Sequence, residues 1–196
     1  MQILTRLIVS FLTISLSFSA LANFKELQHF GQNPGDLGAS YFATQAQSKA
    51  LVVLLHGCAQ HGEQLAQQSG LLGLAKEHGF ALLIPQQRLM NNIKRCFNWY
   101  SDDDYTKDKG ESSSIKNMIT TLQKQLGTES VYIIGLSGGG AMASNMLVNY
   151  PYLFEAGAVV AGIPFPCADD LITGISCMKN GPSQTIEELV SLTRNL

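Results

Sequence analysis

Charged residues are few in this sequence, and they form no cluster of one sign. Asp, Glu, Lys and Arg make up 14% of its 196 residues, and 13 basic against 15 acidic side chains leave a formal net charge of −2. This composition excludes a disordered polyampholyte and a charged coiled coil. A nucleic-acid-binding protein is disfavoured because no basic block is present. The length suits a single domain, and no internal repeat or linker divides the chain.

Long apolar runs are missing everywhere except at the N-terminus. There, Arg6 precedes an apolar run over residues 7–16, and residues 20–22 (Ala-Leu-Ala) form a small-x-small cleavage signature. We therefore expect a cleaved signal peptide over residues 1–22, a mature domain over residues 23–196, and export to the periplasm or the medium. A membrane anchor is the alternative, but the apolar part falls short of the roughly 20 residues that a span needs.

Short apolar runs closed by turn residues predict buried strands, and they alternate with segments of helical spacing. Strands are expected at 50–55, 80–84, 131–134 and 156–160, with a short one at 41–44, and helices at 64–76, 112–125, 138–150 and 185–194. Pro85 is expected to end the second long strand, and Ser112 or a neighbour to cap the second helix. Residues 86–109 predict a long polar loop. The alternation implies an α/β fold with a mostly parallel sheet covered by helices on both faces.

The sharpest motif is Gly135-Leu136-Ser137-Gly138-Gly139, which follows a predicted buried strand and opens a predicted helix. That context is typical of a nucleophile elbow, in which the serine hydroxyl is exposed above the sheet. Side chains at positions 135 and 139 would collide with neighbouring backbone, and glycine avoids that collision. The pattern therefore predicts Ser137 as nucleophile and the Gly138 amide as an oxyanion donor. The alternative is a glycine-rich turn without chemistry.

A second motif, His56-Gly57-Cys58, follows the first long strand. In serine hydrolases of this layout a His-Gly pair begins the loop that gives the second oxyanion amide, here that of Cys58. We favour a structural role for His56 in supporting this loop. The alternative, His56 as catalytic base, is disfavoured because the usual chain order is Ser, acid, His.

Several separate motifs, in order along the chain, resemble the poly(3-hydroxybutyrate) depolymerase family of secreted esterases. They are Asn33-Pro34-Gly35, residues 54–60 (Leu-Leu-His-Gly-Cys-Ala-Gln), residues 96–100 (Cys-Phe-Asn-Trp-Tyr), residues 135–143 around Ser137, residues 161–164 (Ala-Gly-Ile-Pro), Cys167-Ala168 and Cys177-Met178. The resemblance implies an α/β-hydrolase fold and a Ser-Asp-His mechanism on carboxylic esters. The expected substrate is a polyhydroxybutyrate-type polyester or its oligomers; feruloyl or acetyl esters of polysaccharides are the alternative.

The four cysteines fit this resemblance. Export makes them disulfide candidates, and four cysteines allow three pairings. We favour Cys58–Cys96 and Cys167–Cys177, with free or differently paired thiols as the alternative. In the same resemblance Trp99 is a candidate for lining the acyl pocket, although it could equally be a packing residue.

The sequence departs from the family in one respect, because no histidine follows Ser137. The four histidines are His29, His56, His61 and His78. In the family the acid and the base come from later strand ends, so the resemblance implies an incomplete hydrolase domain that lacks the last strands. Asp169 and Asp170 are interpreted as solvated loop residues, with the triad acid as the alternative.

Without a histidine after Ser137, the chain lacks the expected catalytic base, and this affects the expected activity. We expect the product of residues 23–196, expressed alone, to be inactive and prone to aggregate, because strand 156–160 would be an uncovered apolar edge. A non-catalytic binding protein on the hydrolase scaffold and a fragment without a role are the alternatives. Neither a metal nor another cofactor is implied, and the sequence leaves the oligomeric state open.

Overall fold

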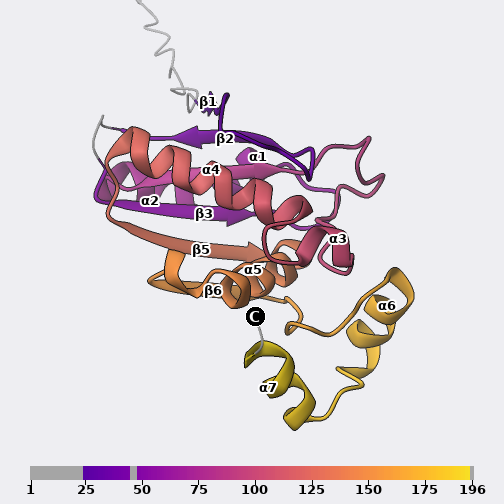
Figure 1. Ribbon diagram of the computed structural model, residues 1–196. Coiled ribbons are helices and arrows are strands. Elements are labelled where there is room, and N and C mark those ends of the chain that lie inside the picture. The colour runs from indigo at the N-terminus through magenta and orange to yellow at the C-terminus, as the bar shows by residue number, and fades with distance from the viewer. Residues whose placement is uncertain (1–23, 45–47, 195–196) are drawn as a thin grey trace, which may run out of the picture.

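A computed structural model describes residues 24–44 and 48–194 (Figure 1). The expected signal peptide, residues 1–22, lies outside the described residues. Within these two ranges, no helix has the length and apolar character that crossing a bilayer would require.

Six strands form one sheet with the order β1-β2-β4-β3-β5-β6. Their bounds are β1 Lys25–Glu26, β2 Gly38–Phe42, β3 Ala50–Leu55, β4 Ala81–Gln86, β5 Ser130–Leu136 and β6 Ala156–Val160. The strands β4, β3, β5 and β6 run parallel, while β1 and β2 pair antiparallel at one edge. The mostly parallel sheet predicted from the alternating pattern is therefore confirmed.

Helices cover both faces of this sheet. Helices α1 Gly62–Gln68 and α2 Leu71–His78 lie on one face, and α4 Gly110–Leu126 and α5 Gly138–Asn149 lie on the other. The remaining helices are α3 Asp102–Tyr105, the 3-10 helix η1 Pro151–Leu153, α6 Leu171–Asn180 and α7 Ile186–Arg194. The run of apolar residues in β3 is buried on both sides: Leu51 and Val53 pack with residues of α4 and α5, and Val52 and Leu54 pack with residues of α1 and α2. This two-sided burial explains why β3 lacks polar alternation.

Two predictions for the stretch between β3 and the long polar loop are wrong. The helix expected at 64–76 is two helices, because the chain turns at Gly70, whose φ of 79° is left-handed. Strand β4 does not end at Pro85 but continues to Gln86, with Pro85 opposite Ala39 of β2. Pro85 is tolerated because the parallel pairing of β4 with β3 ends at Leu83, so its missing N–H breaks no bond to β3.

The expected strand 41–44 lies at Gly38–Phe42, and the short strand β1 was not predicted. The loop expected at 86–109 contains the short helix α3. Helix α4 begins earlier than predicted, and its N-cap is Lys109 without a side-chain cap. Ser112 is buried inside this helix, where its hydroxyl donates to the carbonyl of Tyr105 (3.0 Å).

The last third of the chain holds the largest unpredicted feature, helix α6. Asp170 begins it as N-cap and accepts from the backbone N–H of Thr173 (2.7 Å), a capping box that the loop interpretation of Asp170 missed. Strand β6 is the sheet edge among the described residues, and all five of its residues are exposed. In Figure 1, α6 and α7 lie beyond β6, away from the sheet.

Candidate active site

The turn between β5 and α5 places Ser137 at the carboxyl edge of the sheet. Ser137 has φ 55° and ψ −120°, a conformation that non-glycine residues rarely adopt and that costs about 1–3 kcal/mol. A methyl group at Gly135 would overlap the backbone of Gly139, and one at Gly139 would overlap the carbonyl groups of Leu55 and His56. The predicted collision of side chains at positions 135 and 139 is thus confirmed. The turn exposes Ser137 while Gly138 is buried.

The His56-Gly57-Cys58 turn lies beside this serine, because β3 and β5 are paired with Leu55 opposite Gly135. A methyl group on Gly57 would lie 3.3 Å from Cβ of Ser137, and one on Gly138 would lie 3.0 Å from Sγ of Cys58. The structure therefore brings together the two segments that the sequence singled out. In the part of the chain that the structure describes, the backbone amides of Cys58 and Gly138 donate to no protein acceptor.

His56 is fully buried, and both of its ring nitrogens are engaged. Nδ1 lies 2.7 Å from the carbonyl oxygen of Gly57, and Nε2 accepts from the backbone N–H of Gln87 (3.1 Å). Burial lowers the pKa of His56, which favours the neutral ring with its proton on Nδ1. With no free nitrogen, His56 supports the turn and is poorly suited to act as a base.

A cavity of about 810 Å³ opens at Ser137. Cys58 and Gly138 line it beside the serine, and so does Trp99, which is only 8% exposed. The wall formed by the residues after β6 and by α6 is apolar and includes Ile163, Leu171, Ile175 and Met178. The wall formed by residues 87–98 contains Ile93 but is otherwise largely polar, with Asn91, Asn92, Lys94 and Asn98. The apolar wall suits an apolar acyl or alcohol group.

Two disulfides hold the walls of this cavity. The structure pairs Cys58 with Cys96 and Cys167 with Cys177, the pairing favoured from the sequence. The first joins the turn beside Ser137 to the segment that leads to Trp99. The second ties α6 to the chain that precedes it.

Helix α6 meets Trp99 at Gly174, where a methyl group would lie 3.1 Å from the indole. Helix α6 is not among the predicted helices, although the sequence carries a signal for it: Asp170 is followed three residues later by Thr173, and Gly181 follows the helix.

Among the described residues that line the cavity there is no histidine and no carboxylate. His29, His61 and His78 are exposed and line other parts of the surface. Asp169 and Asp170 are exposed at the start of α6, where both accept from the hydroxyl of Thr173 (2.9 Å each). No group of three or more metal-binding side chains occurs within residues 24–44 and 48–194.

Solved structures with the same arrangement define the class. An acetyl xylan esterase from Aspergillus awamori superposes with a TM-score of 0.70 and 26% identity, over 77% of this chain and 56% of that one. A poly(3-hydroxybutyrate) depolymerase from Bordetella parapertussis shares the fold with a TM-score of 0.55 and 15% identity, over 69% of this chain and 50% of that one. The fold is therefore that of the α/β-hydrolases, as expected.

The particular family follows from the sequence comparison. The chain belongs to the Esterase PHB depolymerase family, which matches residues 39–193. Poly(3-hydroxyalkanoate) depolymerase C of Paucimonas lemoignei is 34% identical over 88% of this chain and 42% of its own length. Feruloyl esterase B of Thermothelomyces thermophilus is 32% identical over 75% of this chain and 51% of its own length. The chain thus spans about half the length of the curated relatives it matches.

Proposed function

We propose that this chain carries the nucleophile and the oxyanion-binding groups of an exported serine esterase. The observation that carries the proposal is the strained Ser137 turn beside two backbone amides, those of Gly138 and Cys58, that have no protein acceptor among the described residues. Such amides stabilise the negative charge that develops on an ester carbonyl oxygen during acyl transfer.

The reaction would proceed through an acyl-enzyme. Oγ of Ser137 attacks the ester carbonyl carbon and loses its proton to a base, while the carbonyl oxygen becomes an oxyanion held by the two amides. The alcohol leaves with a proton, and water then releases the acid from Ser137. Since the described cavity lining offers no histidine or carboxylate, the proposal covers the nucleophile and the oxyanion donors but assigns no base.

We propose a polyester of hydroxyalkanoate units, or its oligomers, as the substrate class. The apolar wall of the cavity and the similarity to a poly(3-hydroxyalkanoate) depolymerase support this choice. Esters of ferulic or acetic acid are the second candidate, supported by the relatives named feruloyl esterase and acetylxylan esterase. A panel of hydroxybutyrate oligomers, methyl ferulate and acetylated xylan would rank them by the residual kcat/KM that the nucleophile and the oxyanion donors support without an assigned base.

Reaction with a fluorophosphonate tests the nucleophile. The oxidised protein is incubated with the probe, and the labelled peptide is identified by mass spectrometry. Labelling at Ser137 that is lost in Ser137→Ala, but kept when the buried Ser112 is changed to Ala, supports the proposal. Absence of labelling combined with measurable binding of hydroxybutyrate oligomers would favour a non-catalytic binding protein instead.

A further inference from the structure

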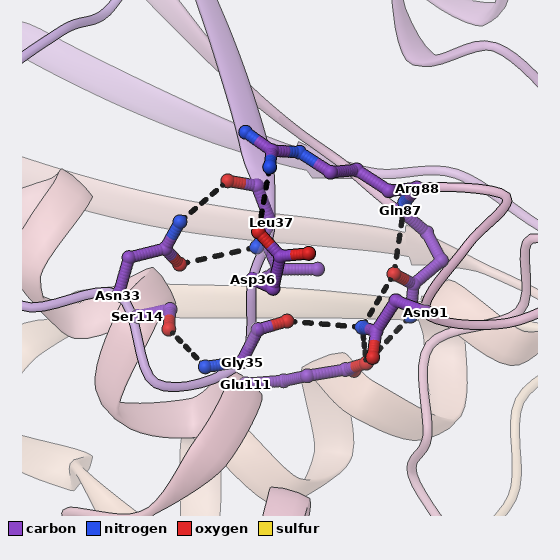
Figure 2. A network of polar contacts seen from close by, with 9 residues as sticks. All are labelled: Asn33, Gly35, Asp36, Leu37, Gln87, Arg88, Asn91, Glu111 and Ser114. Carbon is purple, nitrogen blue, oxygen red and sulfur yellow. Dashed lines mark hydrogen bonds and ion pairs between the residues drawn. The ribbon is translucent and has the colours of Figure 1, made fainter.

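One buried carboxyl group lies behind the cavity and outside its lining. Glu111, the second residue of α4, is fully buried. Its Oε2 accepts from the backbone N–H of Asn98 (2.8 Å), and its Oε1 accepts from the side-chain amides of Gln87 (2.5 Å) and Asn91 (3.4 Å). Figure 2 shows Glu111 with the last two of these donors. Burying a carboxyl group without a cationic partner is unfavourable unless hydrogen bonds satisfy it, and here all three donors come from residues 87–98.

The three donors to Glu111 lie along one segment, and two of them stand at its ends. Gln87 begins this segment, residues 87–98, and Asn98 ends it. The side-chain amide of Gln87 also donates to the carbonyl of Cys96 (2.9 Å), and that of Asn91 donates to the carbonyl of Gly35 (2.9 Å). The segment between them lines the cavity. A single carboxyl group therefore sets the separation between the two ends of a cavity wall.

The same segment holds the turn that bears the proposed Cys58 amide. Cys96 is bonded to Cys58, and the carbonyl of Lys94 accepts from the backbone N–H of Ala59 (2.6 Å). At the other end, the backbone N–H of Gln87 donates to the buried His56 ring. Any shift of the segment is thus transmitted to both sides of Cys58.

We propose that Glu111 is a positioning residue, which accepts hydrogen bonds from both ends of the 87–98 segment and thereby fixes the Cys58 amide and Trp99 relative to Ser137. The inference rests on the proposed function, since it gives these groups their roles. Glu111 touches neither the cavity nor Ser137, and it acts only through the segment that it holds.

The charge on Glu111 links this position to pH. Burial raises the pKa of Glu111 to about 8, and the nearby charge of Asp104 is the next largest cause. The hydrogen bonds that Glu111 accepts from N–H donors lower this pKa and offset part of the rise. The titratable groups facing it are Asp104 from α3, whose Oδ1 accepts from the N–H of Glu111 (3.3 Å), and His56 through Gln87. The ion pair of Arg88 with Asp36 is exposed beside Gln87. Deprotonation at alkaline pH changes the charge where the two segment ends meet.

Trp99 is the only tryptophan in the sequence and directly follows Asn98, so its fluorescence reports on the segment. The test compares the oxidised wild type with Glu111→Gln, which keeps the volume but removes one acceptor oxygen. Ser112→Ala is the matched control, because it removes a buried hydrogen bond in the same helical turn that does not reach the segment. In Glu111→Gln, we expect acrylamide quenching of Trp99 to increase and fluorophosphonate labelling of Ser137 to slow by about 10²-fold. We expect both to stay at wild-type values in Ser112→Ala.

A pH titration of the wild type tests the proposal even if a variant fails to fold. The emission of Trp99 should show a transition above neutral pH that Glu111→Gln lacks. A flat wild-type titration, equal quenching in Glu111→Gln and Ser112→Ala, or unchanged labelling of Ser137 in Glu111→Gln would each overturn the positioning role. If Trp99 responds as expected but wild-type Ser137 takes no label, the proposed function fails and the structural link from Glu111 to the segment stands.

Discussion

Two glycine-to-alanine substitutions, identical in chemistry, should have opposite effects on stability. Gly135 lies two residues before Ser137, and a methyl group there would sit 2.5 Å from the carbonyl carbon of Gly139 and 2.7 Å from the nitrogen of Gly140. Favourable contacts between carbon atoms lie at about 3.5–4.0 Å, so the overlap is about 1 Å and falls on backbone that cannot rotate away. Gly73 lies inside α2, and a methyl group there would meet nothing within 4 Å.

The magnitudes follow from these surroundings. Forcing the backbone apart in a packed site costs about 3 kcal/mol, the upper end of the usual range for overpacking. Alanine in place of glycine inside a helix stabilises by about 1 kcal/mol. Gly135→Ala should therefore unfold at a lower urea concentration than the wild type, and Gly73→Ala at a higher one. The two variants should differ by about 4 kcal/mol, or roughly 10³-fold in the unfolding constant.

Urea unfolding of the oxidised proteins, followed by far-UV circular dichroism, measures both free energies. Fluorophosphonate labelling in the absence of urea adds the functional readout: Gly73→Ala should label Ser137 as the wild type does, and Gly135→Ala should label it more slowly. If Gly135→Ala were as stable as the wild type and labelled at the same rate, the reasoning about the turn would be refuted.

Three further predictions concern other parts of the molecule. The Cys58→Ser/Cys96→Ser variant should lose about 4 kcal/mol, because the bond closes a loop with a sequence separation of 38; a loss below about 1 kcal/mol in urea unfolding would contradict the chain-entropy estimate. Since the pKa of Glu111 is raised to about 8 from 4.5, its contribution to stability is complete below the lower value and is lost as pH rises through about 8. The urea midpoint of Glu111→Gln should not fall with rising pH in this way. If the midpoints of the wild type and of Glu111→Gln fell in parallel, the pH dependence would belong to another group. Val159→Lys, on the exposed edge strand β6, should reduce aggregation in light scattering, whereas Leu74→Lys on α2 should not; equal effects would argue against edge pairing.

The local signals in the sequence were strong where only one residue type fits the backbone conformation. Gly135 and Gly139 are needed because their neighbours are backbone atoms, so the five-residue motif and its flanking strand and helix were found correctly. The strands at 50–55 and 156–160 were found to the residue, because each is a short apolar run with clear ends. The break at Gly70 was missed because the apolar spacing continues across it on both sides.

The candidate site was only partly visible in the sequence. Ser137, Cys58 and Trp99 come from three separate motifs, and they lie at one cavity because the ends of β3 and β5 are adjacent in the sheet. Helix α6 was not predicted, so its contribution to the cavity wall was missed. Glu111 carries no local signal at all, since its environment is formed by Gln87, Asn91 and Asn98 from a different part of the chain.

The alternation of the long strands and helices, the strained Ser137 turn and the family resemblance can all be read from the amino-acid sequence, because they depend on neighbouring residues and on short-range backbone sterics. Tertiary structure alone decided which strands are neighbours, that both nitrogens of His56 are engaged, and that Glu111 is buried against the 87–98 segment. These features arise from contacts between segments far apart in sequence, for which no local pattern provides a signal.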